Sequence, residues 1–156
     1  MLYATMKCTF KIRRAFVTGI ILTSLSGCSL SIMNFVRNLS DNPLNVTIIT
    51  PFTLSEIKPF TFYSDTIVEI NHKTWKHLKD SLPVTRIDSR TYSFIVPAHS
   101  TTNLWPNISL HFENLKEVKA ILSQGKFTDT IKFNEIAKKL QHVRSRIYHY
   151  DYTDQK

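Results

Sequence analysis

Glycine and cysteine are both scarce in this chain of 156 residues. The three glycines are Gly19, Gly27 and Gly125, whereas a phosphate-cradling loop needs several glycines close together. Nucleotide-binding loops of that kind are therefore excluded. The two cysteines are Cys8 and Cys28, and the first lies in a segment that we expect to be removed. The mature chain then keeps one cysteine and forms no intrachain disulfide.

The chain also lacks an apolar run long enough for a comfortable transmembrane helix. The run at residues 15–25 spans 11 residues, whereas a helix that crosses the hydrocarbon core needs about 20. No acidic residue precedes this run, and four basic residues do: Lys7, Lys11, Arg13 and Arg14. A basic segment followed by a short apolar segment is typical of an export signal whose cationic end stays in the cytoplasm.

The apolar run ends in Leu25-Ser26-Gly27-Cys28. This tetrapeptide resembles the lipobox of bacterial lipoproteins with type II signal peptides, in which an aliphatic residue and small residues precede the modified cysteine. The resemblance implies cleavage between Gly27 and Cys28, a diacylglycerol on the Cys28 thiol and a palmitate-like acyl chain on the new amino group. The alternatives are an uncleaved N-terminal anchor and a plain secretory leader, and both also keep the protein outside the cytoplasm.

The lipoprotein resemblance also carries expectations about location and partners. Ser29 follows the cysteine, which in the Gram-negative sorting rule implies the outer membrane or its periplasmic face rather than the inner membrane. Without the four leader cations, the 20 basic and 12 acidic residues become 16 and 12, so a net charge of +8 falls to +4. This modest charge disfavours nucleic acid. The expected partners are membrane lipid through acylated Cys28 and an envelope protein or anionic polymer.

Residues 32–112 read mostly as strands and turns. The segments 45–50 and 91–96 alternate apolar and polar residues, with Val46 and Ile48 on one face of the first and Tyr92, Phe94 and Val96 on one face of the second. Further strands are expected at 32–37, 60–63, 66–70, 84–87 and 107–112. The turn formers at 40–43 predict a hairpin between the first two strands.

Short strands at turn-bounded intervals predict a mainly antiparallel β fold, an immunoglobulin-like sandwich or a small barrel. The segments TYSFIVPAHSTTNL (91–104) and RNLSDNPLNVTIITP (37–51) are similar to small Gram-negative envelope lipoproteins with immunoglobulin-like strands. That resemblance implies a β-rich fold and no activity.

Helices are expected at three places. A short one is predicted at 72–81, and two C-terminal helices are predicted within 113–150. The first of these begins with the capping pair Asn114 and Glu117 and ends at Gly125. The second covers 134–150, where apolar residues recur every three or four positions: Phe133, Ile136, Leu140, Val143, Ile147 and Tyr150.

The expected organisation follows from these elements. Residues 1–27 are the signal peptide, 28–31 the lipidated tether, 32–112 a β-rich domain, 113–150 two helices packed on it and 151–156 a polar tail. An α+β arrangement is the alternative fold.

No catalytic, metal or cofactor site is expected. The chain has no G-x-S-x-G nucleophile elbow, and the pairs His72/His77 and His142/His149 lack the three- or four-residue spacing of ligands on one helical face. The step Pro97-Ala98-His99-Ser100 reads as a turn rather than as part of a catalytic triad.

The most suggestive surface feature is a basic stretch around Trp75. On the predicted helix 72–81, Lys73, Lys76 and Lys79 share one stripe, which would suit anionic polymers or lipid headgroups; the alternative is a solvated lysine face. We therefore expect a lipid-anchored cell-envelope protein that acts as a non-catalytic binding or structural component. The alternative is a membrane-anchored enzyme, such as a hydrolase of cell-wall or surface polymers.

Overall fold

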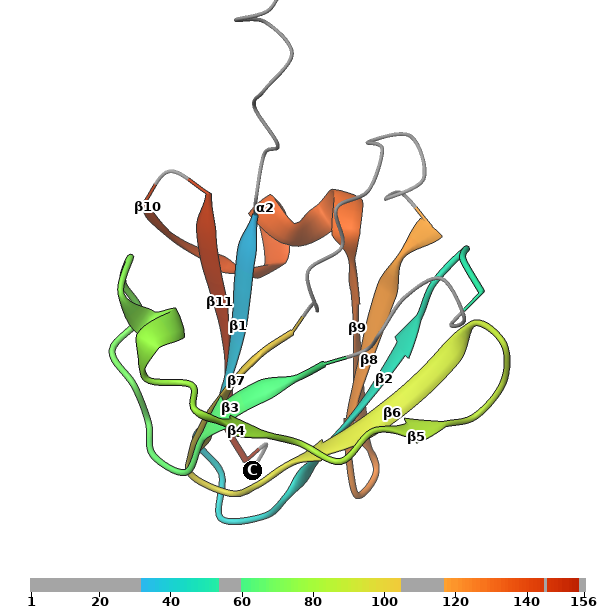
Figure 1. Cartoon of the computed structure of the whole chain (residues 1–156), viewed down its shortest axis with the longest axis horizontal. Coiled ribbons are helices and arrows are strands. Elements are labelled where there is room, and N and C mark those ends of the chain that lie inside the picture. Colours follow the sequence, from blue (N-terminus) through green and yellow to red (C-terminus); the bar gives the residue numbers. More distant parts are fainter. Residues whose placement is uncertain (1–31, 54–59, 105–116, 145, 155–156) are drawn as a thin grey trace, which may run out of the picture. The chain divides into compact units, whose positions relative to one another are not determined.

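Strands form about half of the chain that the computed structural model describes, which comprises residues 32–53, 60–104, 117–144 and 146–154 (Figure 1). These residues belong to one unit, Ser31–Lys156. The strands are β1 (Met33–Asn38), β2 (Leu44–Ile49), β3 (Phe62–Ser64), β4 (Asp80–Ser81), β5 (Thr85–Arg86), β6 (Thr91–Val96), β7 (Ser100–Asn103), β8 (Lys119–Gln124), β9 (Phe127–Lys132), β10 (Gln141–Arg144) and β11 (Ile147–Tyr152). The helical turns are η1 (Thr74–Lys76), η3 (Phe133–Glu135) and α2 (Ile136–Lys139).

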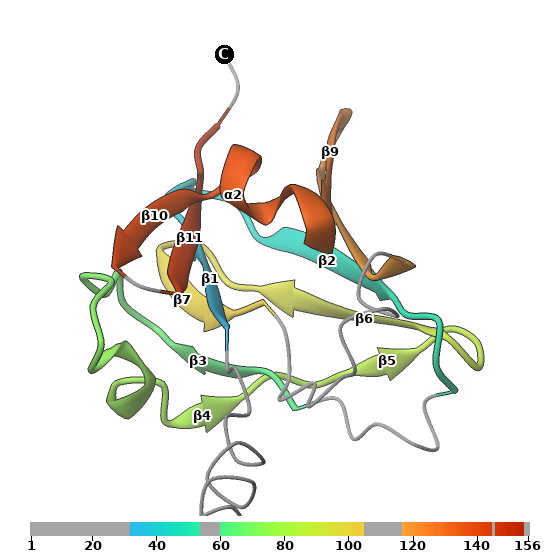
Figure 2. The same cartoon turned by 90° about the horizontal axis from the view of Figure 1, so that it is seen from above.

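The strands form two sheets, in the orders β10-β11-β1-β7-β3-β4 and β5-β6-β2-β8-β9 (Figures 1 and 2). The pairs are antiparallel apart from β1 and β11, which run parallel with Met33 opposite Ile147 and Asn38 opposite Tyr152. The prediction of a mainly antiparallel β fold is confirmed. The predicted hairpin is wrong, because β1 and β2 lie in different sheets and the turn at 40–43 carries the chain from one sheet to the other.

One hydrophobic core joins the inner faces of both sheets. The predicted alternation in β2 and β6 is confirmed, because Val46, Ile48, Tyr92, Phe94 and Val96 are all buried in this core. From the six-stranded sheet, Val36 and Tyr152 belong to the same core. The outer face of the six-stranded sheet carries a second cluster, which we call the outer cluster: Phe35, Ile70, Leu78 and Ile147, with Met33 packed against it.

The outer cluster explains why β1 is apolar on both sides. Phe35 and Val36 are neighbours with side chains on opposite faces, and both are buried. Parallel strands occur almost only where both faces of the sheet are covered. Here the segment that carries Ile70 and Leu78 covers the outer face beside the parallel pair.

The two predicted C-terminal helices are replaced largely by strands. Residues 119–124 form β8, in which Ala120 and Leu122 alternate into the core, and Gly125 takes a positive φ of 58° in the turn to β9 instead of ending a helix. Of the second predicted helix only Ile136–Lys139 is α-helical. Tyrosines at every second position make 147–152 a strand.

Three smaller expectations also change. The segment 66–70 is not a strand, and the predicted helix 72–81 is only the 3-10 turn Thr74–Lys76 followed by β4. The predicted tail loses Asp151 and Tyr152 to β11. The expected strand 107–112 lies outside the described residues.

Candidate functional site

The three lysines singled out from the sequence lie on a loop, residues 71–79, which we call the basic loop. Because it contains only one 3-10 turn, the predicted stripe of lysines along a helix at 72–81 is wrong. Lys73, Lys76 and Lys79 are nevertheless all exposed. Residues 71–79 contain no acidic residue, and they include His72 and His77.

A set of local hydrogen bonds fixes the conformation of the basic loop. The Asn71 backbone N–H donates to the Thr74 hydroxyl at 2.8 Å, and that hydroxyl donates to the Glu69 carbonyl at 3.1 Å. The Asn71 side chain accepts a 2.8 Å bond from the Lys73 N–H. Thr74 is fully buried, and Leu78 is buried in the outer cluster. Leu78 thus packs the loop against the sheet, and Thr74 holds it to the preceding residues 69–71.

Trp75 points the other way. It is 56% exposed, and the Lys76 Nζ lies 5.4 Å from its ring centroid, within the range of a cation–π contact. An indole held at the surface between lysines is a feature of sites that meet an interface, since tryptophan combines a large apolar area with a polar N–H.

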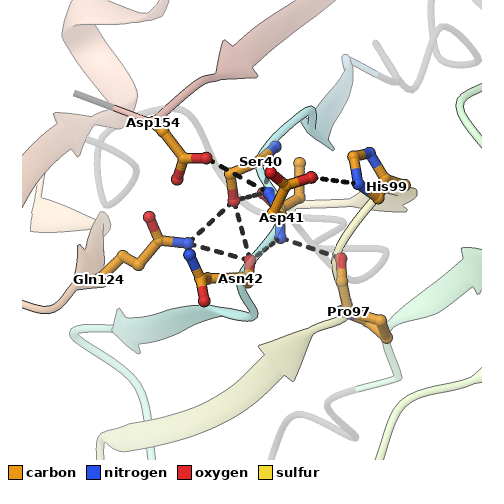
Figure 3. A network of polar contacts seen from close by, with 8 residues as sticks. Ser40, Asp41, Asn42, Pro97, His99, Gln124 and Asp154 are labelled. Atoms are coloured by element: carbon orange, nitrogen blue, oxygen red, sulfur yellow. Dashed lines mark hydrogen bonds and ion pairs between the residues drawn. The ribbon is translucent and has the colours of Figure 1, made fainter. Parts of the chain in front are cut away.

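A hydrogen-bonded network closes the C-terminal end of β1, at Asn38 (Figure 3). We call it the turn network: Asn38, Ser40, Asn42, Pro97 and Gln124. The Asn38 Nδ2 donates to the carbonyls of Asn42, Val96 and Pro97 at 2.9, 3.2 and 2.9 Å. The Asn38 Oδ1 accepts from the Ser40 N–H and hydroxyl at 3.2 and 2.6 Å. The Gln124 Nε2 donates to the Ser40 hydroxyl and to the Asn42 carbonyl, both at 2.9 Å.

A histidine–carboxylate pair lies at the edge of this network. His99 has a positive φ of 52°, and its Nε2 is 2.9 Å from Asp41 Oδ1, with both side chains exposed. Such a pair resembles two thirds of a catalytic triad. The neighbouring hydroxyls are used elsewhere, because Ser100 donates to the Pro97 carbonyl at 2.6 Å and Ser40 to Asn38 and Asn42. The geometry is that of a turn, as the sequence predicted.

A partly buried charge cluster lies on the outer face of the six-stranded sheet. Arg37 Nε and Nη2 donate to the two Asp151 carboxylate oxygens at 2.6 and 2.5 Å, and His149 Nε2 is 3.3 Å from Arg37 Nη2 and 3.5 Å from Asp151 Oδ1. Burial lowers the pKa of His149, against the attraction of Asp151 and with the repulsion of Arg37. Its Nδ1 is buried without a hydrogen-bond partner. The neutral imidazole is therefore the favoured form.

A second carboxylate joins β9 to two other elements. Asp129 accepts from Lys139 Nζ at 2.5 Å and from the Tyr150 hydroxyl at 3.0 Å. Burial acts to raise the pKa of Asp129, but the hydrogen bonds from Lys139, Tyr150 and the Thr130 N–H outweigh it and lower that pKa. Burial of the Tyr150 hydroxyl, with its hydrogen bond to the Asp129 carboxylate, raises the pKa of Tyr150 to about 12. This group is a structural clamp between α2, β9 and β11.

Sequence reasoning missed these paired groups. Arg37 and Asp151 are 114 residues apart, and His99 and Asp41 are 58 apart, so no local spacing signals either pair. The predicted lipidation and cleavage residues, Cys28 and Gly27, lie outside the described residues. Among those described, no three His, Cys, Asp or Glu side chains are grouped to hold a metal ion.

Comparisons with known proteins found no matching family model, no similar curated protein and no similar solved structure. Within the described part of the chain, no helix is long and apolar enough to span a bilayer.

Proposed function

We propose that the protein is a lipid-anchored component of the bacterial cell envelope, held in the outer membrane or at its periplasmic face through Cys28. The observation that carries this is the order Leu25-Ser26-Gly27-Cys28 directly after a basic and then apolar leader. The described residues begin at Ile32, and the first strand begins at Met33. A cut before Cys28 therefore leaves both sheets whole in the mature protein.

The anchor is permanent on energetic grounds. Each buried methylene contributes about 0.8 kcal/mol, so one acyl chain binds reversibly while two or more hold a protein stably. A diacylglycerol thioether on Cys28 already supplies two chains, and acylation of the new amino group adds a third.

We infer that the folded part of the mature chain, which we call the body, has a binding or structural role rather than a catalytic one. The polar side chains of the turn network and of the Arg37–Asp151 pair are engaged in bonds that hold strands and turns together. Two sheets with open edge strands and one shared core support a sandwich over a small barrel, because closure removes edges. We further propose that the strands are arranged as in an immunoglobulin-like sandwich.

A hydrolase is the second candidate, and the His99–Asp41 pair is what favours it. A carboxylate-paired histidine can serve as a general base, and a positive φ at a residue other than glycine is uncommon. A His99→Gln variant would abolish release of fragments from cell-wall polymers by such an enzyme. If the wild type releases none, the binding role is supported.

The experiment that tests the proposal is intact-mass analysis of protein extracted from membranes. The expected mass lacks residues 1–27 and includes the added acyl chains. A Cys28→Ala variant should remain unprocessed, whereas the matched control Cys8→Ala should mature normally because Cys8 lies in the removed segment. A Cys28→Ala protein that matures and partitions like the wild type would overturn the lipoprotein assignment.

A further inference from the structure

The end of the body from which the tether leads carries a group of exposed lysines and arginines. The Met33 N–H donates to the Arg146 carbonyl at 3.0 Å, so the β10–β11 turn, with the exposed Arg144 and Arg146, lies beside the start of β1. Met33 also packs against the outer cluster, which includes Leu78 of the basic loop. The basic loop and the arginine turn therefore border the same end of β1.

Charge is distributed unequally between the two ends of β1. Residues 71–79 and 141–148 together hold three lysines and two arginines and no acidic residue. At the other end, beside Asn38, the turn network is flanked by the exposed carboxylates of Asp41 and Asp154. The exposed Glu69 and Asp80 flank residues 71–79, and the exposed Lys126 lies beside the turn network. Five cations against these two carboxylates still leave an excess of positive charge at the end of β1 where the tether joins it.

We propose that the basic loop, with Trp75 at its tip and the arginine turn beside it, docks on the anionic headgroups of the bilayer that holds Cys28. This rests on the proposed function. Four residues lie between Cys28 and Met33, and a chain extends at most about 3.6 Å per residue step, so the start of β1 stays within roughly 18 Å of the Cα atom of Cys28.

The chemistry of the loop suits a headgroup layer. Tryptophan is enriched where membrane meets water, and lysine side chains reach outward to phosphates while their stems lie on apolar surface. The exposed indole with Lys76 against it has that composition. Because Leu78 packs against the sheet and Thr74 is bonded to residues 69 and 71, Trp75 is presented without a large loss of conformational freedom on docking.

The test measures quenching of Trp75 fluorescence by lipids that carry a shallow nitroxide. Acylated full-length mature protein is reconstituted in phosphatidylcholine vesicles with and without phosphatidylglycerol. The chain has a second tryptophan, so the Trp75 signal is taken as the difference between the wild type and Trp75→Phe. We expect strong quenching in anionic vesicles and weak quenching in neutral ones.

Two charge reversals supply the specificity control. Lys73→Glu should reduce the ratio of docked to undocked protein by roughly fivefold or more, since each cation near an anionic surface contributes about that factor. Lys126→Glu makes the same charge change in the β8–β9 turn, next to Gln124 and the turn network, and should leave quenching unchanged. Neither position is buried.

Several results would overturn the docking surface. These are an unquenched Trp75 in acylated, vesicle-bound protein, equal quenching in neutral and anionic vesicles, or equal effects of the two reversals. If soluble polyphosphate changes the Trp75 fluorescence and vesicles do not, the loop binds an anionic polymer and not the bilayer. Intact mass separates the two proposals: absence of acyl chains refutes both, while an acylated protein with unquenched Trp75 refutes only the docking surface.

Discussion

Replacing Asn38 by alanine should destabilise the protein more than any other polar substitution in the turn network. The side chain is fully buried, and its amide contacts three carbonyl groups and two donors of Ser40. An amide NH2 has two hydrogens, so at most two of the three donor contacts are full hydrogen bonds. About four bonds are therefore lost, each with a net value of about 1 kcal/mol.

We expect Asn38→Ala to lower the free energy of unfolding by about 3 kcal/mol, because part of the loss is recovered where water reaches the partly buried carbonyls. For a domain of this size that corresponds to a fall in melting temperature of roughly 10 °C. Guanidinium unfolding followed by circular dichroism measures it as a lower midpoint at unchanged slope.

The control is Asn45→Ala, which removes the same side chain from an exposed position in β2 and should change stability by less than about 0.5 kcal/mol. An Asn38→Asp variant adds a sharper test, since its carboxylate would face three carbonyl oxygens. It should gain stability as the pH falls and the acid becomes a donor. Equal effects of Asn38→Ala and Asn45→Ala would refute the reasoning.

Three further predictions concern charge and packing. Burial holds the pKa of His149 below its ordinary 6.5, so the unfolded protein binds the proton at a higher pH than the native protein does. The free energy of unfolding, measured with denaturant, should therefore fall as the pH drops below 6.5. His149→Phe should remove this pH dependence. Asp129→Asn weakens the bond to Lys139. At pH values where the wild-type carboxylate is ionised, it should lower the free energy of unfolding by about 1 kcal/mol. This difference should disappear in acid, as the pH falls through the lowered native pKa of Asp129. Leu122→Ala should cost about 2–5 kcal/mol by leaving a cavity, whereas Ile95→Ala, 56% exposed, should unfold at nearly the wild-type midpoint.

Local pattern predicted the strands well where one face alone is buried. The segment 91–96 is a strand with the expected inward residues, because alternation at period two reports a half-buried sheet directly. β1 begins one residue later than expected. Its partners, β7 and β11, are remote in sequence, so its place in the middle of a sheet could not be read locally.

The C-terminal error has a physical cause. Residues 133–150 contain a true helical stripe, and Ile136, Leu140 and Ile147 on it are buried. Val143 on the same stripe is 38% exposed, however, and the strand places Tyr148, Tyr150 and Tyr152 on the other face. Tertiary pairing with β1 overrides the helical pattern because it buries Tyr152, packs Tyr148 and Tyr150 against the core and supplies a parallel partner.

The candidate site was predicted by composition but not by geometry. The cluster of lysines around Trp75 was visible in the sequence, yet the arginine turn beside it is brought there by the β1–β11 register. Likewise, the loop is held by Thr74 and Leu78 rather than by a helix. Contacts between strands decide which charges share one end of the body.

The C-terminal boundary of the fold gives a last prediction, made by ending the chain after Tyr152 or after Tyr150. The first truncation removes residues 153–156, of which Thr153 and Asp154 are exposed, and should leave stability within about 1 kcal/mol of wild type. The second also removes Asp151 and Tyr152, which leaves the buried side of Arg37 without its carboxylate.

Tyr152 is 2% exposed, donates its hydroxyl to Gln124 at 3.1 Å and accepts the Leu39 N–H at its carbonyl at 2.8 Å. Loss of this aromatic side chain costs about 3–5 kcal/mol, and an unpaired guanidinium adds to it. Since whole domains are stable by only about 5–15 kcal/mol, the chain ending at Tyr150 should be largely unfolded by circular dichroism. A cooperative transition near the wild-type temperature in that shorter chain would mean that the β1–β11 pair does not hold the fold together, and that the tail begins at Asp151 after all.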